Sequence, residues 1–353
     1  MDFNLSEDRR MLSDTLQRYL GDNYDIETRN KLAYTAPYHS PEKWQEMAEL
    51  GILSALVDEA HGGFGGDGFD ISVVFEELGR ALCPEPFLAN LMCLRLAQSC
   101  DDKALIEAIT TGQSRAALAV FEPDNYDTLS TLTTSAESSG DSWELTGQKA
   151  VVYGAPGADV LLVAAQSAGK LALFKCEAVD IKDYAMIDGG GAGEINLSAT
   201  PATQVSADAT SILEEALDAG RLALCAEAVG AMDALLAMTV EYLGQRQQFG
   251  TTIATFQALQ HRVVDMAMEI EQARSITVLA ASKLNDGERA RYVAMAKNLV
   301  GRAATLIGEE STQLHGGIGM TWEYGGSHYA KRLIMLDHQL GDRFQQINKL
   351  LAA

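Results

Sequence analysis

Arginine, glutamine and glycine residues near two predicted helix ends have the types and spacing of a phosphate-binding site. Arg246 opens the segment RQQFGTTIATFQ, which contains a glycine-centred turn and ends at Gln257. A guanidinium can bind a phosphate through two parallel hydrogen bonds. Farther along, Gln313 opens the segment QLHGGIGM, where Gly316 and Gly317 lack side chains, so backbone N–H groups can approach an anion. Together the two segments predict a diphosphate site at the ends of bundle helices.

Each of these residues, taken alone, also has a purely structural explanation. Arg246 fits a surface salt bridge, Gln257 a capping or buried polar side chain, and the Gly316–Gly317 pair a helix C-cap. The combination of a guanidinium, amides and a glycine pair favours an anionic ligand over three independent structural roles.

Other ligand-binding motifs are not supported by their surroundings. Residues 63–68, GFGGDG, match the G-x-G-x-x-G pattern of dinucleotide sites, but a helical stretch precedes them instead of a strand, which predicts a turn between helices. The six histidines form neither Glu-x-x-His nor His-x-x-x-His, and the five cysteines form no Cys-x-x-Cys. The sequence therefore predicts no metal site.

The composition excludes several classes of protein. Of the 353 residues, 47% are hydrophobic and 22% are charged, which is typical of a folded globular protein and not of a disordered chain. The 49 acidic residues against 27 basic ones give a formal charge of -22, which disfavours nucleic acid and anionic membranes as partners. The odd cysteine count predicts free thiols and a cytoplasmic location. The acidic first residues predict no signal peptide, and the lack of an apolar run near about 20 residues predicts no membrane span.

The elements that position the candidate site follow from proline placement and periodicity. All seven prolines precede residue 202, and the Pro-free remainder predicts long helices at about 211–244, 256–285, 288–312 and 327–351. Before it, short apolar segments such as AALAVF, TLSTLTT, DVLLVAA and LALFK predict strands, and the first hundred residues show helical periodicity behind an N-cap at Ser6. We predict an α+β multidomain fold with an N-terminal helical domain (1–113), a middle antiparallel β-domain (114–210) and a C-terminal four-helix bundle (211–353).

Several long segments resemble the acyl-CoA dehydrogenase family. The segments WQEMAELGIL and FEELGRALCPEPFL are similar to its first helical domain, and WELTGQKAVVYGAPGADVLLVAA is similar to its middle β-domain. The bundle signatures RQQFGTTIATFQALQHRVVDM and QLHGGIGMTWEY are the most specific, and the resemblance covers nearly the whole chain.

The resemblance implies that FAD is bound between subunits. Arg246 and Phe249 match the arginine and phenylalanine of the family's R-x-x-F-G motif, and Gln257 matches its glutamine eleven residues after the arginine. The family's Q-x-x-G-G segment, which holds the FAD diphosphate of a neighbouring subunit, maps to Gln313, Gly316 and Gly317. A homo- or hetero-oligomer is therefore implied.

The reaction that the family performs is the α,β-desaturation of an acyl-CoA thioester. A carboxylate removes the α-proton, the β-hydride passes to the flavin, and the electrons leave to an electron-transfer flavoprotein. The resemblance thus implies an oxidoreductase of fatty acid or sterol side-chain β-oxidation.

The family's catalytic base is missing from both of its usual positions. The glutamate of the E-G-[ST] segment is replaced in Leu340-Gly341-Asp342, and the alternative glutamate before an arginine is replaced in Gly220-Arg221. Asp342 is the nearest carboxylate. It can serve as the base or merely cap the last helix, whereas Asp337 is interpreted as a surface or helix residue.

The flavin-facing segments of the middle domain also depart from the family pattern. The usual T-E-P-G-[AS]-G-S becomes FEPDN at residues 121–125, and the usual W-[IV]-[ST] triplet becomes VVY at 151–153. Tyr153 either replaces the missing hydroxyl or is a core aromatic residue.

These departures resemble the small subunits of heteromeric acyl-CoA dehydrogenases and leave three hypotheses. The chain is the FAD-contacting partner of a glutamate-bearing homologue, or a self-sufficient homo-oligomeric dehydrogenase that uses Asp342, or a non-redox acyl-CoA-binding or scaffold subunit.

Overall fold

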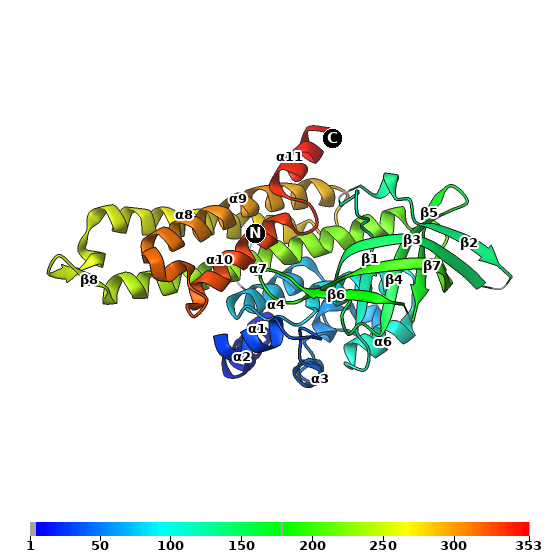
Figure 1. The fold of residues 1–353 in the computed structure, drawn as a ribbon, viewed down its shortest axis with the longest axis horizontal. Helices are drawn as coiled ribbons and strands as arrows, with labels where there is room; N and C mark the ends of the chain where they lie inside the picture. The colour runs from blue at the N-terminus through cyan, green and yellow to red at the C-terminus, as the bar shows by residue number, and fades with distance from the viewer. Residues whose placement is uncertain (1–4, 127, 141, 178, 353) are drawn as a thin grey trace. The chain divides into compact units, whose positions relative to one another are not determined.

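The computed structural model describes residues 5–126, 128–140, 142–177 and 179–352. They form two compact units, and the order of helical, β and again helical elements that the sequence predicts is confirmed (Figure 1). One unit, called here the bundle unit, comprises Met1–Arg29, Gly68–Cys83 and Arg221–Ala353; the other, the sheet unit, comprises Asn30–Asp67 and Pro84–Gly220. Each unit thus combines segments from more than one predicted domain, so the boundaries at 113 and 210 stay predictions.

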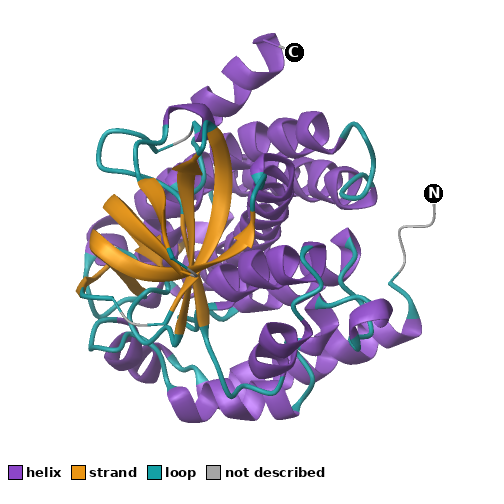
Figure 2. Cartoon of the chain, turned by 90° about the vertical axis from the view of Figure 1, so that its right-hand side faces the viewer, coloured by secondary structure: helices purple, strands orange, loops and turns teal. Residues whose placement is uncertain are grey.

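The sheet unit is built around one seven-stranded sheet, orange in Figure 2. Its path runs β1-β4-β2-β3-β7-β5, with β6 paired to β7 and β5 also paired to β4. The long strands β3 and β7 pair antiparallel, as predicted, but β1 and β4 pair in parallel, so the sheet is mixed. The strands are β1 (Ala116–Ala119), β2 (Ser135–Ser139), β3 (Ser142–Tyr153), β4 (Val160–Ser167), β5 (Lys170–Cys176), β6 (Ile181–Ala185) and β7 (Gly191–Ser206).

One predicted strand is wrong. The segment TLSTLTT contains a short 3-10 helix, Leu129–Thr131, and the next strand starts at Ser135. The remaining helices of this unit are α3 (Pro41–Glu49), α5 (Phe87–Ser99) and α6 (Lys103–Thr110), with 3-10 turns at Ser54–Leu56 and Glu59–His61. The GFGGDG segment follows the second of these turns, so no strand precedes it, as predicted.

The bundle unit contains most of the long helices. They are α1 (Glu7–Asn23), α4 (Gly68–Arg80), α8 (Gln257–Ser282), α9 (Arg289–His315), α10 (Gly325–His338) and α11 (Arg343–Ala352). Two helices cross from one unit into the other along the chain, α2 (Ile26–Ala33) and α7 (Thr210–Gln245). Ser6 caps α1 as predicted, because its hydroxyl accepts the Arg9 N–H at 3.3 Å.

The fourth predicted bundle helix, 327–351, is wrong in one respect, because it is two helices. α10 ends at His338 and α11 starts at Arg343. Between them Leu340 has φ +58° and Gly341 has φ +96°, which are left-handed conformations that a continuous right-handed helix cannot contain. The break therefore falls at Leu340-Gly341-Asp342, the segment that the resemblance aligns with the position of a catalytic base.

Two glycines let α4 and α7 pack with their backbones in contact. A Cβ added to Gly79 would lie 2.0 Å from the Glu227 carbonyl oxygen, and one added to Gly230 would lie 1.8 Å from that of Glu76. Both distances are far inside van der Waals contact, so only glycine fits at either position. The two helices therefore cross at a distance that no other residue pair permits.

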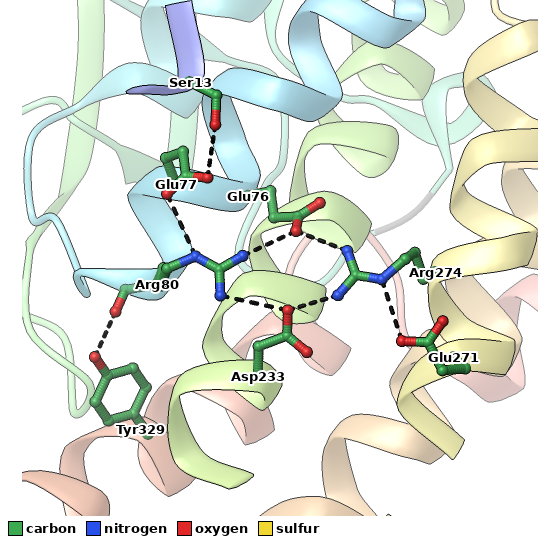
Figure 3. A network of polar contacts seen from close by, with 8 residues as sticks. All are labelled: Ser13, Glu76, Glu77, Arg80, Asp233, Glu271, Arg274 and Tyr329. Atoms are coloured by element: carbon green, nitrogen blue, oxygen red, sulfur yellow. Dashed lines mark hydrogen bonds and ion pairs between the residues drawn. The ribbon is translucent and has the colours of Figure 1, made fainter. Parts of the chain in front are cut away.

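Charged side chains join this helix pair to α8 (Figure 3). The Arg80 guanidinium contacts Glu76 on its own helix at 3.0 Å and Asp233 of α7 at 3.4 Å. Arg274 of α8 binds the same two carboxylates, with Glu76 at 2.7 Å. Two arginines thus share two carboxylates, and this fixes the rotation of the three helices about one another.

The length and composition of α7 alone would allow it to cross a membrane. However, 67% of its most apolar 18-residue stretch is buried inside the protein, as in the core helix of a folded domain. All five cysteine thiols are free.

A buried ion pair anchors the segment that leads out of β1. The Glu122 carboxylate accepts the Lys149 Nζ at 3.0 Å, and neither side chain is exposed by more than 6%. Thr133 and Thr134 each donate a backbone N–H and a hydroxyl to the same carboxylate at 2.7–2.9 Å. These hydrogen bonds lower the pKa of Glu122 to about 2, against the opposing effect of burial.

Replacing Glu122 with alanine is expected to destabilise the sheet unit strongly. The substitution leaves the Lys149 ammonium buried without its counter-charge, which costs on the order of 3–5 kcal/mol. Urea unfolding measures the free energy, and Glu137→Ala on the exposed face of β2 is the matched control. A loss below about 1 kcal/mol, the range of exposed pairs, would show that the pair is solvated.

Candidate functional site

Arg246 lies directly after the end of α7, the helix-end position that the sequence predicts. Its backbone N–H donates to the Tyr242 carbonyl at 2.9 Å, and the chain then turns through a hairpin of β8 (Gln247–Gln248) and β9 (Thr251–Thr252). The Arg246 side chain is exposed and makes no ion pair with any residue that the structure describes. At the hairpin tip Phe249 has φ +55° and is 93% exposed. A cation and an aromatic ring are therefore presented together to an outside ligand.

Gln257 and Gln313 lie on the helices that flank this hairpin. Gln257 is the first residue of α8, and Gln313 lies near the end of α9; both side chains are exposed. The Arg262–Glu310 ion pair, 2.6 Å long, joins the start of α8 to the end of α9. The first turns of α8 and the last turns of α9, which carry the two glutamines, therefore lie at the same end of the bundle.

The glycine pair closes α9 in an open environment. Gly316 has φ +66° and is the C-cap of α9, and its N–H donates to the Thr312 carbonyl. Gly317 is the second residue of the 3-10 helix Gly316–Met320. A Cβ added to either glycine would meet no atom within 4 Å, so Gly317, whose φ is not positive, is not required by packing. The helix-cap explanation is thus correct for Gly316, and the space around both glycines still fits an approaching anion.

A buried series of hydrogen-bonded side chains, which the sequence did not predict, holds this glycine turn. The Thr239 and Ser311 hydroxyls lie 2.9 Å apart, and the His315 Nδ1 lies 2.8 Å from the Ser311 carbonyl oxygen. Because a carbonyl only accepts, Nδ1 carries the proton, and Nε2 accepts the Tyr324 hydroxyl at 2.6 Å. The eight-residue loop between His315 and Tyr324 is therefore closed at its base.

The same histidine connects the two predicted segments. Its ring lies 4.7 Å from that of Tyr242, one helical turn before Arg246. The histidine within QLHGG and the tyrosine within TWEY were the available sequence signals, but nothing in a single sequence relates them to Tyr242. The residues present fit a diphosphate: an exposed, unpaired guanidinium and open glycine backbone lie at one end of the bundle, fixed by this contact.

In the segment between α10 and α11, the position that the resemblance aligns with a catalytic base holds a leucine. Leu340 is 3% exposed, and its carbonyl accepts the Arg221 Nε at 2.9 Å. Asp342 is the N-cap residue of α11, because its Oδ1 accepts the backbone N–H groups of Phe344 and Gln345 at 2.9 and 2.8 Å. The capping role that the sequence left open is present, and a role as base stays a prediction.

A buried lysine behind this segment was not foreseen. Lys297 of α9 is 1% exposed, and its Nζ donates to the carbonyls of Leu336 and Asp337 at 2.6 and 2.7 Å. Asp337 lies in α10 and is buried, so its interpretation as a helix residue is correct and as a surface residue is wrong. Its carboxylate lies 3.6 Å from Arg343 Nε. These contacts fix the position of the break between α10 and α11.

The middle-domain segments that would face a flavin are engaged in contacts of their own. Glu122 and Asn125 form an isolated bridge, and the Glu122 carboxylate is saturated by its five donors. At the end of β3, Val151 has φ +50° and its N–H donates to Glu194, which also accepts the Tyr184 hydroxyl at 2.7 Å. Tyr153 is half-buried, so both interpretations of it stay open.

Comparison with known proteins gives the class to which this geometry belongs. The model of the acyl-CoA dehydrogenase N-terminal domain matches residues 6–101, and that of the C-terminal domain matches 210–338. This chain therefore belongs to the acyl-CoA dehydrogenase family, whose members are oxidoreductases that act on CH–CH bonds.

Individual relatives cover nearly the full chain at modest identity. The chain is 28% identical over 340 residues to the probable acyl-CoA dehydrogenase YngJ of Bacillus subtilis, with 88% of each chain covered. It is 26% identical to the glutaryl-CoA dehydrogenase of Desulfococcus multivorans, covering 97% of this chain and 99% of that one. Among solved structures, a variant of the Tcur3481–Tcur3483 steroid ACAD superposes with a TM-score of 0.90 at 27% identity, covering 98% and 97% of the two chains.

Replacing Lys297 with methionine is expected to change how stability depends on pH. Burial lowers the pKa of Lys297 from its ordinary 10.5 to about 8, so between these values the folded protein binds fewer protons than the unfolded chain. The stability of the native protein relative to Lys297→Met should therefore rise from about pH 8 to pH 10.5. Urea unfolding across this range measures the difference, and a difference that stays flat would mean that the lysine titrates normally.

Proposed function

We propose that this chain is an FAD-contacting subunit of a heteromeric acyl-CoA dehydrogenase. The observation that carries the proposal is a contrast within one chain. The end of the bundle that fits a diphosphate is open and unpaired, whereas the base position holds a buried leucine and the nearest carboxylate caps a helix. Chemistry on an acyl thioester requires a base, so the proposal places that base on a partner subunit that carries a glutamate.

FAD is the cofactor, and when bound it supplies the acceptor for the hydride. Arg246 pairs with its diphosphate, and the backbone at Gly316 and Gly317 approaches the same charge. Phe249 offers a ring at the hairpin tip, and Gln257 and Gln313 offer amides that hydrogen-bond to either donors or acceptors. The His315–Tyr324 hydrogen bond closes the loop that contains the glycine turn, which supports its proposed role in this binding.

The assignment of a partner and a substrate draws on the relatives. One solved relative is described as the Tcur3481–Tcur3483 steroid ACAD, and another structure of the same fold as a ChsE4–ChsE5 complex from Mycobacterium tuberculosis. By analogy, the substrate is an acyl-CoA of fatty acid or sterol side-chain β-oxidation, and an electron-transfer flavoprotein takes the electrons. The proposed location is the cytoplasm, in keeping with free thiols.

The alternative is a homo-oligomeric enzyme in which Asp342 is the base. The two backbone donors of the cap both bind Oδ1, which leaves Oδ2 to accept a proton. A non-redox scaffold is the remaining alternative, and a flavin absorption band in the purified protein excludes it.

Replacing Arg246 with alanine is expected to reduce FAD retention. Loss of a charge-assisted hydrogen bond costs roughly 1.5–3 kcal/mol, or about 10- to 150-fold in affinity. The flavin-to-protein ratio of the purified complex measures it, with Gly317→Val as a second variant that crowds the glycine turn. The control is Arg291→Ala at the exposed start of α9. A full flavin complement in both folded variants would contradict the cofactor role.

Replacing Asp342 with asparagine distinguishes whether the catalytic base is Asp342 or a residue of a partner subunit. Asparagine is also a good N-cap, so α11 should keep its start. If a partner carries the base, acyl-CoA-dependent flavin bleaching by the complex should change less than about tenfold, whereas loss of a general base costs about 10²- to 10⁴-fold. The protein expressed alone should be nearly inactive. Robust activity of the chain alone, abolished by this substitution, would establish Asp342 as the base instead.

A further inference from the structure

The bundle unit contains a pocket that has no part in the site described above. Its volume is about 410 Å³, within the range of small-molecule sites. The wall comes from α1, the start of α2, the end of α4, Met238 of α7 and the start of α10. None of the residues assigned to the diphosphate end or to the α10–α11 break lines it.

Two glycines on facing elements keep this pocket open. Gly21 lies inside α1, where glycine costs about 1 kcal/mol relative to alanine, and a Cβ added to it would meet no atom within 4 Å. Gly325, the first residue of α10, has no positive φ, and an added Cβ would lie 3.3 Å from the Met238 methyl. Neither glycine is needed by the backbone, so their missing side chains amount to space in the pocket.

The polar part of the wall is a carboxylate–guanidinium pair. Glu77 is 8% exposed; its Oε1 accepts the Ser13 hydroxyl at 3.0 Å and its Oε2 accepts the Arg80 Nε at 3.3 Å (Figure 3). The other Arg80 nitrogens bind Glu76 and Asp233. The Tyr329 hydroxyl is also engaged, because it donates to the Arg80 carbonyl.

This pairing defines the polar group that the pocket accepts. A carboxylate oxygen has room for a second hydrogen bond, but Glu77 is already bound by Arg80, whose guanidinium also binds Glu76 and Asp233. An anionic ligand would therefore be desolvated beside an excess of carboxylates, and a cationic ligand would be desolvated while competing with Arg80 for Glu77. An uncharged hydroxyl or amide can instead donate to Glu77 at no such cost. The rest of the wall is predominantly apolar and includes the rings of Tyr24 and Tyr329.

We propose that this pocket binds an uncharged, mainly apolar ring compound through one hydroxyl or amide group that hydrogen-bonds to Glu77. The ring body occupies the space that Gly21 and Gly325 leave between α1 and α10. The proposal is independent of FAD and of any partner subunit, so its failure would leave the proposed function untouched.

Fluorescence titration of the full chain with three pyrene probes tests the head group. The probes share one apolar body and differ in the head: 1-hydroxypyrene is neutral, 1-pyrenecarboxylate is anionic and 1-pyrenemethylammonium is cationic. We expect 1-hydroxypyrene to bind at least about tenfold more tightly than either charged probe, because each buried unpaired charge costs more than one hydrogen bond returns. Equal binding of the three probes would overturn the proposal.

Substitutions at the glycines test the location. Gly21→Leu fills the pocket with a good helix former, so the fold should persist while the affinity for 1-hydroxypyrene falls at least about tenfold. Gly325→Leu should act in the same direction from the opposite wall. The matched control is Gly287→Leu, because Gly287 also has nothing within 4 Å but lies in the loop between α8 and α9. Unchanged binding to folded Gly21→Leu would refute the site.

Substitution of Glu77 tests the chemistry. Glu77→Gln keeps the shape and the hydrogen bond from Ser13 but removes the charge that faces Arg80. We expect the preference to shift by about tenfold toward 1-pyrenecarboxylate, because the guanidinium gains an unpaired face. An unchanged order of the three probes in this variant would show that Glu77 does not contact the head group, and the proposal would fall.

Discussion

The contact of the α4 and α7 backbones at Gly79 and Gly230 is the constraint on which the bundle unit depends. Because no side chain fits between the helices there, their separation is set by backbone atoms alone, and the shared carboxylates of Glu76 and Asp233 then set their rotation. The part of α7 that belongs to the bundle unit is positioned by this contact. In its first half α7 meets the break between α10 and α11 through Arg221, and Arg246 directly follows its C-terminal end.

The sequence predicted the long bundle helices well, because proline absence and apolar periodicity are strong local signals. It failed where a local signal is absent. Leucine rarely adopts a positive φ, so the sequence around Leu340 does not predict the break between α10 and α11 that this residue and Gly341 form. The segment TLSTLTT has the composition of a strand, but its last two threonines turn to donate hydrogen bonds to Glu122, a contact between residues eleven and twelve positions apart.

The candidate site was predictable in part for a similar reason. Arg246, Phe249, Gln257, Gln313 and the glycine pair stand in contiguous motifs, so one sequence is enough to name them. The roles of the residues that orient them cannot be recognised in the same way, although His315 and Tyr324 themselves lie within QLHGGIGMTWEY. Tyr242, His315 and Tyr324 act through ring stacking and one hydrogen bond between separate elements, and Lys297 reaches α10 from α9, so each becomes visible only once the helices are packed.

Because α7 is continuous, the number of residues in it sets both the position and the orientation of Arg246. Arg221 and Gln245 lie on one unbroken helix, and each residue of an α-helix advances about 1.5 Å and turns about 100°. Inserting or deleting a single residue between them would turn Arg246 to another face of the bundle, although every sequence motif would be unchanged. The count of residues in this stretch is thus under tighter constraint than the identity of most of them, and length variation among functional relatives should be concentrated in the loops at its ends.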